Sequence, residues 1–411
     1  MTPRHLLWSG GLLLSLALAF VMSAPACRPD PGVSGRLSVP TIKPWEYSLD
    51  SMYALRHPDR YAWDLFRMVN WPADTLRQMP DTTRFIGDTG LVVWQTWKTG
   101  PEVYLADGTR PKGWLEKTFG FRSEENFNQF SIKARLPDIS DDPTFGLEEV
   151  VMNEETFTYV LENELYNLNG QLARYLRGDT INFPRGAIEL KVKWRQIRDT
   201  PYEKARYHWQ YVTVYDNGKT SRELYGLVSI HITSKVLQQW FWATFEHIDS
   251  RSQQHPGDDG WLLASRDRFA CTEPPYDCEQ APQNIGLEGT KWEYYVLRGT
   301  QTAFTDDRGA ATLLANSNVE RGFQLSSSCM TCHSLASFGP ILPDSSMARV
   351  DFLPEAPLRH TGFGGKGYVG IPDTALFRLK DGQRMLQTDF AWSLSEANWY
   401  SPGAPKPLVK R

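Results

Sequence analysis

The clearest periodic pattern in the chain lies between residues 188 and 194. Apolar and charged side chains alternate there, with Ile188, Leu190, Val192 and Trp194 separated by Glu189, Lys191 and Lys193. An alternation with a period of two places the apolar side chains on one face of a strand and the charged ones on the other. The segment is therefore predicted to be a strand with one buried face.

Two further segments, residues 207–215 and 223–232, are rich in Tyr, Val, Ile and Thr. They flank Asp216-Asn217-Gly218-Lys219, in which Asn and Gly accept the positive φ angles that a tight hairpin turn needs. A hairpin is predicted here, and a second hairpin is expected to continue it through residues 240–246. Along these strands Ser229 and His231 should share one face, as should Trp240, Trp242, Thr244 and Glu246.

A helical period is found over residues 58–69. Apolar side chains recur there at intervals of three and four residues, at Ala62, Leu65, Phe66 and Val69. Pro72 follows and stops the pattern, so one helix is expected. Towards the other end of the chain, residues 310–328 and 390–399 are also predicted to be helical.

With 411 residues the chain exceeds the length that one hydrophobic core usually organises, so two or more domains are expected. Shorter β-like runs at residues 91–97 and 292–297 favour an antiparallel sheet or sandwich for residues 45–302. Residues 303–411 are expected to form a small all-α domain. The predicted fold class is therefore α+β multidomain, with a β-rich N-terminal domain followed by a helical one.

The N-terminal segment has the pattern of an export signal. A basic start at Arg4 and His5 precedes the apolar residues 6–22, and Ala24-Pro25-Ala26 provides the small side chains of a cleavage site. Residues 1–26 are therefore predicted to be a signal peptide, which directs the chain to the periplasm or otherwise out of the cytoplasm. Residues 27–44, rich in Pro and Gly, are expected to be a tether.

Two alternatives attach the chain to a membrane. About 17 apolar residues is the lower limit for a helix that crosses a bilayer, so an uncleaved anchor is the first alternative. Cys27 directly follows the predicted cut, as in bacterial lipoproteins, but Ala24 stands where the lipoprotein signature wants a large aliphatic residue. A membrane tether through the N-terminus or through Cys27 is left open.

Composition narrows the class of partner. Lys and Arg number 44 against 48 Asp and Glu, a formal net charge of −4, which gives no indication of nucleic-acid binding. The chain also holds 15 Trp and 17 Tyr, more aromatic side chains than an ordinary globular protein needs. This excess indicates tight packing or a binding surface.

Two of the five cysteines lie in one short loop. Cys271 and Cys278 bound the segment Cys-Thr-Glu-Pro-Pro-Tyr-Asp-Cys, whose prolines favour a turn that brings the two ends together. Because export makes disulfides permissible, a disulfide between them is predicted. A second metal site is the alternative, but the loop contains no His and no further Cys.

The segment Cys329-Met330-Thr331-Cys332-His333 matches C-x-x-C-H, the pattern for covalent attachment of a c-type haem. Two thiols on one turn can form thioethers with the two haem vinyl groups, and the adjacent imidazole becomes an axial ligand to iron. A redox-active dithiol, a zinc site and a structural disulfide are the alternatives. A dithiol of the thioredoxin type belongs near a βαβ unit, and zinc needs a further nearby ligand.

Through this motif the chain resembles the cytochrome c family. The resemblance implies a compact helical domain with one haem c per chain, which is held by Cys329, Cys332 and His333 and exchanges electrons with a redox partner protein or a small-molecule donor or acceptor. Across most of its length the chain also resembles uncharacterised bacterial cytochrome c family proteins with a β-rich region. The segments that carry this likeness are residues 54–60, 240–247 and 388–393.

The family's layout implies a sixth iron ligand from a later loop. Met385 is the favoured residue because it precedes a predicted terminal helix, although it lacks the following proline often seen in that family. Met347 is the second choice. His360, which precedes a glycine-rich stretch, is a third.

Electron transfer by an exported single-haem cytochrome is the leading functional hypothesis. It requires a closed iron, with a sixth ligand that leaves no position for substrate. The length of the β-rich region favours two alternatives: a haem enzyme with an open sixth position and a substrate pocket in that region, or a haem-based sensor of a ligand or of redox state. Ligand exchange at the iron separates these classes.

Overall fold

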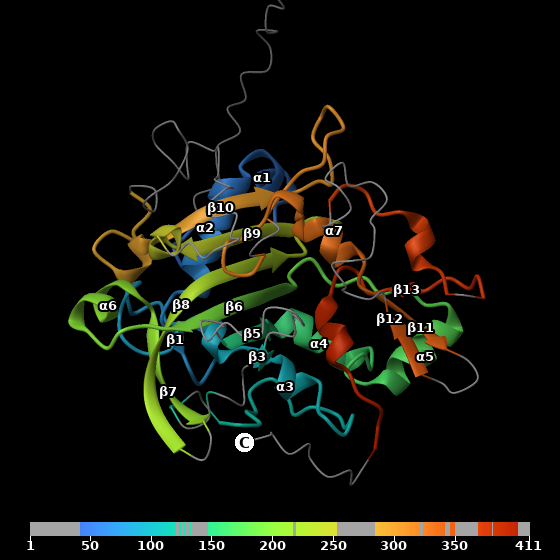
Figure 1. Cartoon of the computed structure of the whole chain (residues 1–411), viewed down its shortest axis with the longest axis horizontal. Coiled ribbons are helices and arrows are strands. Elements are labelled where there is room, and N and C mark those ends of the chain that lie inside the picture. Colours follow the sequence, from blue (N-terminus) through green and yellow to red (C-terminus); the bar gives the residue numbers. More distant parts are fainter. Residues whose placement is uncertain are drawn as a thin grey trace, which may run out of the picture. The chain divides into compact units, whose positions relative to one another are not determined.

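The computed structural model describes the greater part of the chain. Figure 1 shows the arrangement of its elements. The described residues are 42–120, 123–124, 127, 132–133, 147–216, 219–252, 284–320, 324–341, 346–349, 369–379 and 381–401. The predicted signal peptide, most of the tether, Cys27, the predicted disulfide of Cys271 with Cys278, and His360 lie outside these ranges.

The described residues are built around an antiparallel sheet of eight strands, in the order β10-β9-β8-β6-β5-β3, with β4 paired to β5 and β7 paired to β8. This confirms the α+β class and the antiparallel architecture. The strands are β3 (Lys98–Thr99), β4 (Ile132–Lys133), β5 (Leu147–Met152), β6 (Ile188–Gln196), β7 (Trp209–Asp216), β8 (Lys219–Ser234), β9 (Phe241–His247) and β10 (Tyr295–Gln301). A separate two-stranded ribbon pairs β1 (Ala73–Asp74) with β2 (Met79–Pro80).

Strands with a strong period or turn signal are found where the sequence predicts them. The alternating segment at 188–194 is β6, and the predicted hairpin is formed by β7 and β8, in which Asp216 pairs with Lys219. The predicted continuation is β9, which pairs with β8. Each of these segments carries either period-two alternation or hairpin chemistry, which act locally.

The two short β-like runs, residues 91–97 and 292–297, differ from their prediction as strands. Residues 91–97 contain the 3-10 helix η1 (Val93–Thr96), in which the Gln95 side chain accepts a hydrogen bond from the Val92 N–H at 3.1 Å. In the second run only the end is a strand, because η4 (Lys291–Tyr294) precedes β10. Apolar runs of this length do not distinguish a strand from a helical turn, which explains the wrong prediction for 91–97.

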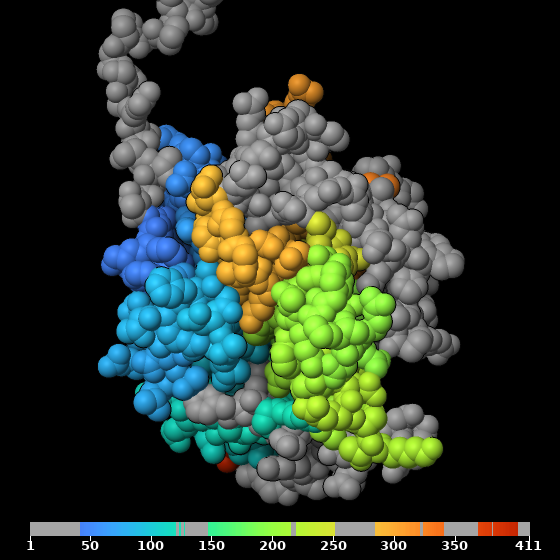
Figure 2. All heavy atoms as spheres, turned by 90° about the vertical axis from the view of Figure 1, so that its left-hand side faces the viewer, coloured from blue at the N-terminus to red at the C-terminus, as the bar shows by residue number. Residues whose placement is uncertain are grey.

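One face of the sheet is apolar and is covered by the predicted helix, α2 (Pro58–Val69). The rings of Trp63 and Phe66 lie 4.9 Å and 4.5 Å from that of Phe245 on β9, centroid to centroid. In Figure 2 the segment after residue 284 lies against these N-terminal elements, where Arg67 donates to the Ile285 carbonyl at 3.3 Å. The α1 helix (Ser51–Arg56) precedes α2.

The remaining helices are short, and none in the described part of the chain has the length and apolar content needed to cross a membrane. They are α3 (Gly100–Val103), α4 (Glu154–Glu162), α5 (Leu168–Arg177), α6 (Pro201–Arg206) and α7 (Cys329–Ser334), together with the 3-10 helix η3 (Ile248–Ser252).

The opposite face of the sheet is polar, and residues 314–320 cross it. Asn316 donates to Ser229 Oγ on β8 at 2.7 Å and to Thr244 Oγ1 on β9 at 2.9 Å. Ser317 donates from its hydroxyl to Glu246 at 2.9 Å. Thr244 and Glu246 lie on one face of β9, as predicted, and the pairing of β8 with β9 places Ser229 on the same side of the sheet. This face binds a segment of the C-terminal third by hydrogen bonds.

One apolar cluster joins residues from both sides of the boundary predicted near residue 303. Met152 and Phe157 from the first part and Met330, Phe338 and Leu394 from the second belong to it. Side chains that share a core in this way exclude water together. The C-terminal residues are therefore packed against the large sheet.

The described residues after 303 do not show the expected all-α domain. They contain the six-residue helix α7, the 3-10 helices η5, η6 and η7, and a three-stranded sheet in the order β12-β11-β13. The elements are η5 (Gln324–Ser326), β11 (Ser337–Ile341), β12 (Ser346–Arg349), η6 (Thr374–Phe377), β13 (Leu386–Gln387) and η7 (Trp392–Glu396).

The helices predicted at 310–328 and 390–399 are accordingly wrong over their described residues. In the first segment the Asn316 and Ser317 side chains bind the sheet, and such polar side chains compete with helical hydrogen bonding. In the second segment a 3-10 helix of five residues, η7, replaces the predicted ten. Tertiary hydrogen bonds outweigh a weak helical period at both places.

Candidate haem-attachment site

The motif lies on α7, and β10 holds that helix in place. Ser328 caps α7 by accepting from the Thr331 N–H at 3.2 Å. Gln301 on β10 donates to Ser328 Oγ at 2.7 Å and accepts from the Met330 N–H at 3.0 Å. Thr331 in turn donates to the Gly370 carbonyl at 2.6 Å. One amide at the end of a sheet strand thus fixes both the cap and the first turn.

Both thiols of the motif are free and half-buried. Their spacing of three residues puts them on the same side of α7. Cys329 Sγ lies 3.5 Å from the Leu314 carbonyl. Cys332 packs against the buried Leu335, as do Leu376, Phe377 and Trp392. Burial, reinforced by the negative charge of nearby Glu320, raises the pKa of both thiols, so they are protonated at neutral pH.

His333 is oriented through one ring nitrogen. Nδ1 lies 2.9 Å from the Phe390 carbonyl, and since a carbonyl only accepts, Nδ1 carries the proton. The other nitrogen, Nε2, then has a lone pair and no hydrogen-bond partner in the described part of the chain. Burial lowers the pKa of His333 to about 4, so its ring is neutral at pH 7. The ring lies 4.6 Å from that of Trp242 on β9.

The carbonyl that orients His333 comes from an unusual turn. Asp389 and Phe390 have positive φ angles of 50° and 69°, which residues other than glycine rarely adopt. An ion pair of 2.6 Å between Lys235 and Asp389 stabilises the turn, and the Phe183 N–H donates to Asp389 at 2.8 Å. This turn lies in the segment 388–393, whose structural role the sequence did not reveal.

The same segment also contacts the second cysteine. Trp392 donates from Nε1 to the Cys332 carbonyl at 3.1 Å, and the Thr388 N–H donates to the Ala336 carbonyl at 2.9 Å. Residues 388–392 therefore bind the C-terminal end of α7 at several points. No sequence motif marks these contacts, because most of them use backbone carbonyls.

The residues predicted as the sixth ligand are not brought to His333 by any described contact. Met385 is half-buried, and its sulfur lies 3.9 Å from the Ser337 hydroxyl. Met347 lies on β12 opposite Pro340, and its side chain is outside the described part of the structure. No group of three or more potential metal-ligating side chains is found in the described residues.

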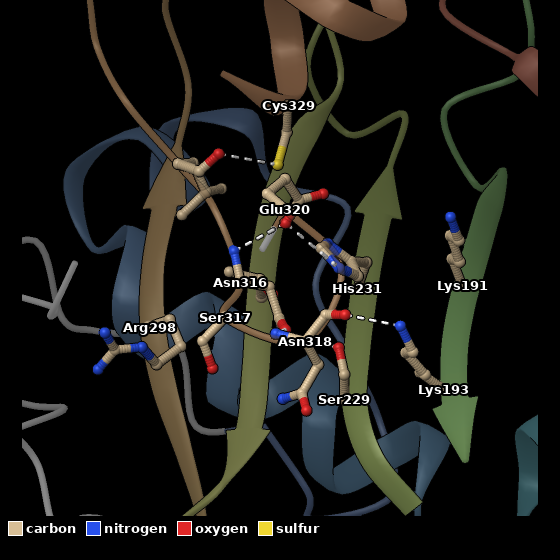
Figure 3. A network of polar contacts seen from close by, with 12 residues as sticks. Lys191, Lys193, Ser229, His231, Arg298, Asn316, Ser317, Asn318, Glu320 and Cys329 are labelled. Carbon is tan, nitrogen blue, oxygen red and sulfur yellow. Dashed lines mark hydrogen bonds and ion pairs between the residues drawn. The ribbon is translucent and has the colours of Figure 1, made fainter. Parts of the chain in front are cut away.

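A cluster of ionisable side chains occupies the polar face of the sheet next to the motif (Figure 3). Lys191 and Lys193 lie 2.9 Å and 3.7 Å from the carboxylate of Glu148. Burial alone would raise the pKa of Glu148, but the two lysines hold it below its usual value. Next to them, His231 Nε2 is 4.0 Å from Glu320 Oε2. The strand face that holds His231 was predictable from the period of two along β8, whereas no sequence signal pointed to Glu320.

Burial also determines the charges of Glu320 and His231. It raises the pKa of Glu320 to about 7, an effect that the charge of Lys191 partly offsets. It lowers the pKa of His231 to about 3, and the positive charges of Lys191 and Lys193 act in the same direction. His231 is therefore a neutral imidazole at pH 7, whereas Glu320 is balanced between its two protonation states.

Glu189 lies on the same strand as Lys191, and its burial predicts that the stability of the protein depends on pH. Its carboxylate accepts from the Ser393 hydroxyl at 2.7 Å, and burial raises its pKa from 4.5 to about 7. Between these values the folded protein holds a proton that the unfolded chain has lost. The stabilising contribution of Glu189 is thus fully present below pH 4.5 and is lost as the pH rises through about 7.

Replacing Glu189 with Gln removes this dependence. The Glu189→Gln variant should gain about 3 kcal/mol in unfolding free energy relative to the wild type between about pH 4.5 and about pH 8. Urea unfolding of both proteins across this range measures the difference in their unfolding free energies. The buried histidines contribute equally to both proteins, so their effect cancels in this difference. Glu46→Gln, at an exposed side chain, is the control and should change the stability far less than Glu189→Gln does. Parallel curves for Glu189→Gln and wild type would contradict a raised pKa.

Comparison with known proteins does not assign the chain to a family: no family model, no curated protein and no solved structure matches it. The case for a function therefore rests on the motif and on the geometry around it.

Proposed function

We propose that this protein is an exported c-type cytochrome that carries one haem, attached through Cys329 and Cys332, and that its function is electron transfer. The observation that carries the proposal is the hydrogen bond between His333 Nδ1 and the Phe390 carbonyl. Histidines that bind metal through one nitrogen usually donate the other N–H to a carbonyl or carboxylate, which fixes the ring and its tautomer. In a C-x-x-C-H motif, this leaves Nε2 ready for iron.

The side chains around the motif fit a haem. Two free thiols lie one turn apart, next to an imidazole held in the ligating tautomer. Aromatic rings border the site: Phe390 lies 6.1 Å from Trp242 and 6.3 Å from Phe304, centroid to centroid. Large apolar side chains exclude water, as a buried porphyrin requires. When bound, a haem supplies reversible one-electron exchange at its iron.

The chain's own residues would hold and orient that group. Cys329 and Cys332 fix it covalently, and Phe390 aims the His333 ring. Trp242 provides a wall from the large sheet. The helical domain expected from the cytochrome c resemblance would then be replaced by a site formed between α7, the turn at Asp389 and the sheet.

The protonated, half-buried thiols bear on the order of assembly. A thioether forms when the thiol S–H adds across a vinyl C=C bond, with the hydrogen passing to carbon, and the thiolate is the reactive form. Burial raises the pKa of Cys329 and Cys332 and so disfavours attack in the folded conformation. Attachment is therefore proposed to precede the final packing of α7. Export to the periplasm and a redox partner, either a protein or a small molecule, complete the proposal.

A haem enzyme with an open sixth position is the second candidate. The buried pair of His231 and Glu320 favours it, because a neutral imidazole and a carboxyl with a pKa of about 7 could move protons for a bound substrate.

The experiment is an absorption spectrum of the reduced protein, produced with haem-maturation machinery, before and after carbon monoxide is added. A second sample is denatured in alkaline pyridine. Haem that stays with the denatured chain and a native spectrum that carbon monoxide leaves unchanged are the expected results. Haem lost on denaturation would refute the c-type assignment. Covalent haem with a shifted native spectrum would replace electron transfer with the enzyme or sensor function.

A further inference from the structure

His231 is a buried imidazole with an unexplained nitrogen. Its side chain is 11% exposed, and Nε2 is buried without a hydrogen-bond partner among the described residues. Among the residues that the structure describes, the nearest carboxylate oxygen is Glu320 Oε2, which is 4.0 Å away and beyond hydrogen-bond distance. A buried polar atom without a partner destabilises the folded protein, and such atoms in native proteins often have a functional reason.

The position of His231 relates it to the haem-attachment motif. On β8 it pairs with Thr244 of β9, and Trp242 lies two residues along β9 on the same face. The ring of Trp242 contacts His333 at 4.6 Å. Residues diagonally opposite on paired strands are within reach of one another through long side chains. His231 therefore reaches from the sheet into the region that His333 enters from α7.

Glu320 relates His231 to the thiols as well. Its carboxylate lies 4.0 Å from His231 Nε2, and its charge acts on both Cys329 and Cys332. Figure 3 shows Glu320 near both Cys329 and His231. The unpartnered imidazole thus belongs to the same cluster as the thiols that would hold the haem.

We propose that His231 is the second axial ligand of the haem iron. This inference rests on the proposed function and deepens it. Coordination to iron would give His231 Nε2 a partner, which it lacks among the described residues. The sulfur of Met385, in contrast, already lies against the Ser337 hydroxyl. Two imidazole ligands close the iron to carbon monoxide. They also give a lower reduction potential than the Met and His pair of ordinary cytochromes c.

The test uses the full-length protein with its attached haem, in wild-type form and as His231→Ala, His231→Met and Met385→Ala. Electron paramagnetic resonance and absorption of the ferric proteins report the ligands directly. The wild type should be low-spin and lack the charge-transfer band of a Met-ligated iron. His231→Ala should become high-spin and bind carbon monoxide when reduced, and added imidazole should restore the low-spin signal. Met385→Ala should retain the wild-type spectrum.

His231→Met keeps the inference testable if the alanine variant does not fold, because it should gain the Met charge-transfer band and a raised potential. A Met–iron band in the wild type would overturn the inference without any variant. So would an unchanged low-spin signal in His231→Ala, or its loss in Met385→Ala. The pyridine sample distinguishes a failure of this inference from a failure of the proposed function. Covalent haem without ligation by His231 refutes this inference alone. Absence of covalent haem refutes the proposed function and this inference with it.

Discussion

Replacing both Cys329 and Cys332 with alanine is expected to abolish covalent haem attachment. The two thioethers are the only bonds that survive denaturation in a c-type cytochrome, since axial ligation is lost when the chain unfolds. The measurement is haem staining after denaturing electrophoresis, together with the pyridine spectrum. The double variant should show complete loss, and each single variant should retain haem through one thioether in reduced yield.

The chain contains matched controls for this result. Cys271→Ala with Cys278→Ala removes the same number of cysteines outside the motif and should leave covalent haem unchanged. His333→Ala should keep the covalent bond but change the ferric spectrum, because the thioethers remain while an axial ligand is lost. Haem staining that persists in the Cys329→Ala, Cys332→Ala protein would mean that the haem is not attached through this motif.

The second large effect is expected at the turn that holds His333. Asp389 and Lys235 form an ion pair of 2.6 Å in which the side chains are 8% and 3% exposed. Asp389→Asn keeps the size and the tolerance for positive φ, but it leaves a buried ammonium without its counter-charge. Breaking a buried pair on one side costs about 3 kcal/mol or more, so urea unfolding should show a loss of about 3 kcal/mol.

The control for Asp389 is a surface pair of the same kind and length. Asp199 and Lys204 also lie 2.6 Å apart, but the aspartate side chain is 52% exposed, so Asp199→Asn should lower stability far less than Asp389→Asn does. Equal losses in the two variants would show that burial does not strengthen the Lys235 pair. The haem-loaded Asp389→Asn protein should also show a perturbed ferric spectrum, since Phe390 orients His333.

Both predictions concern a site that the large sheet helps to build. Gln301 of β10 fixes the start of α7, Trp242 of β9 contacts His333, and Lys235, directly after β8, stabilises the turn at Asp389. The β-rich part would therefore position the haem, in addition to any role in binding a partner. This provides a structural reason for its size that the leading hypothesis lacked.

Much of the large sheet could be predicted from sequence, and the reason is local. Residues 188–194 alternate strictly, and the turn at 216–219 has the chemistry of a hairpin, so each signal is contained within a few residues. The helix at 58–69 has a matching apolar stripe and a proline at its start. Residues 91–97, 310–328 and 390–399 lack such redundancy, and tertiary contacts decided their conformation.

The same division applies to the candidate site. The pair of thiols and the adjacent imidazole could be recognised from the sequence by itself, because C-x-x-C-H is a contiguous pattern, and their spacing predicts a haem. Only the tertiary structure decided what surrounds them. The Phe390 carbonyl, the Gln301 amide and the unpartnered nitrogen of His231 come from segments far apart in the chain. A backbone carbonyl is present in every residue, and a side-chain nitrogen without a hydrogen-bond partner cannot be recognised from the residue type. Such features exist only once the sheet has brought the segments together.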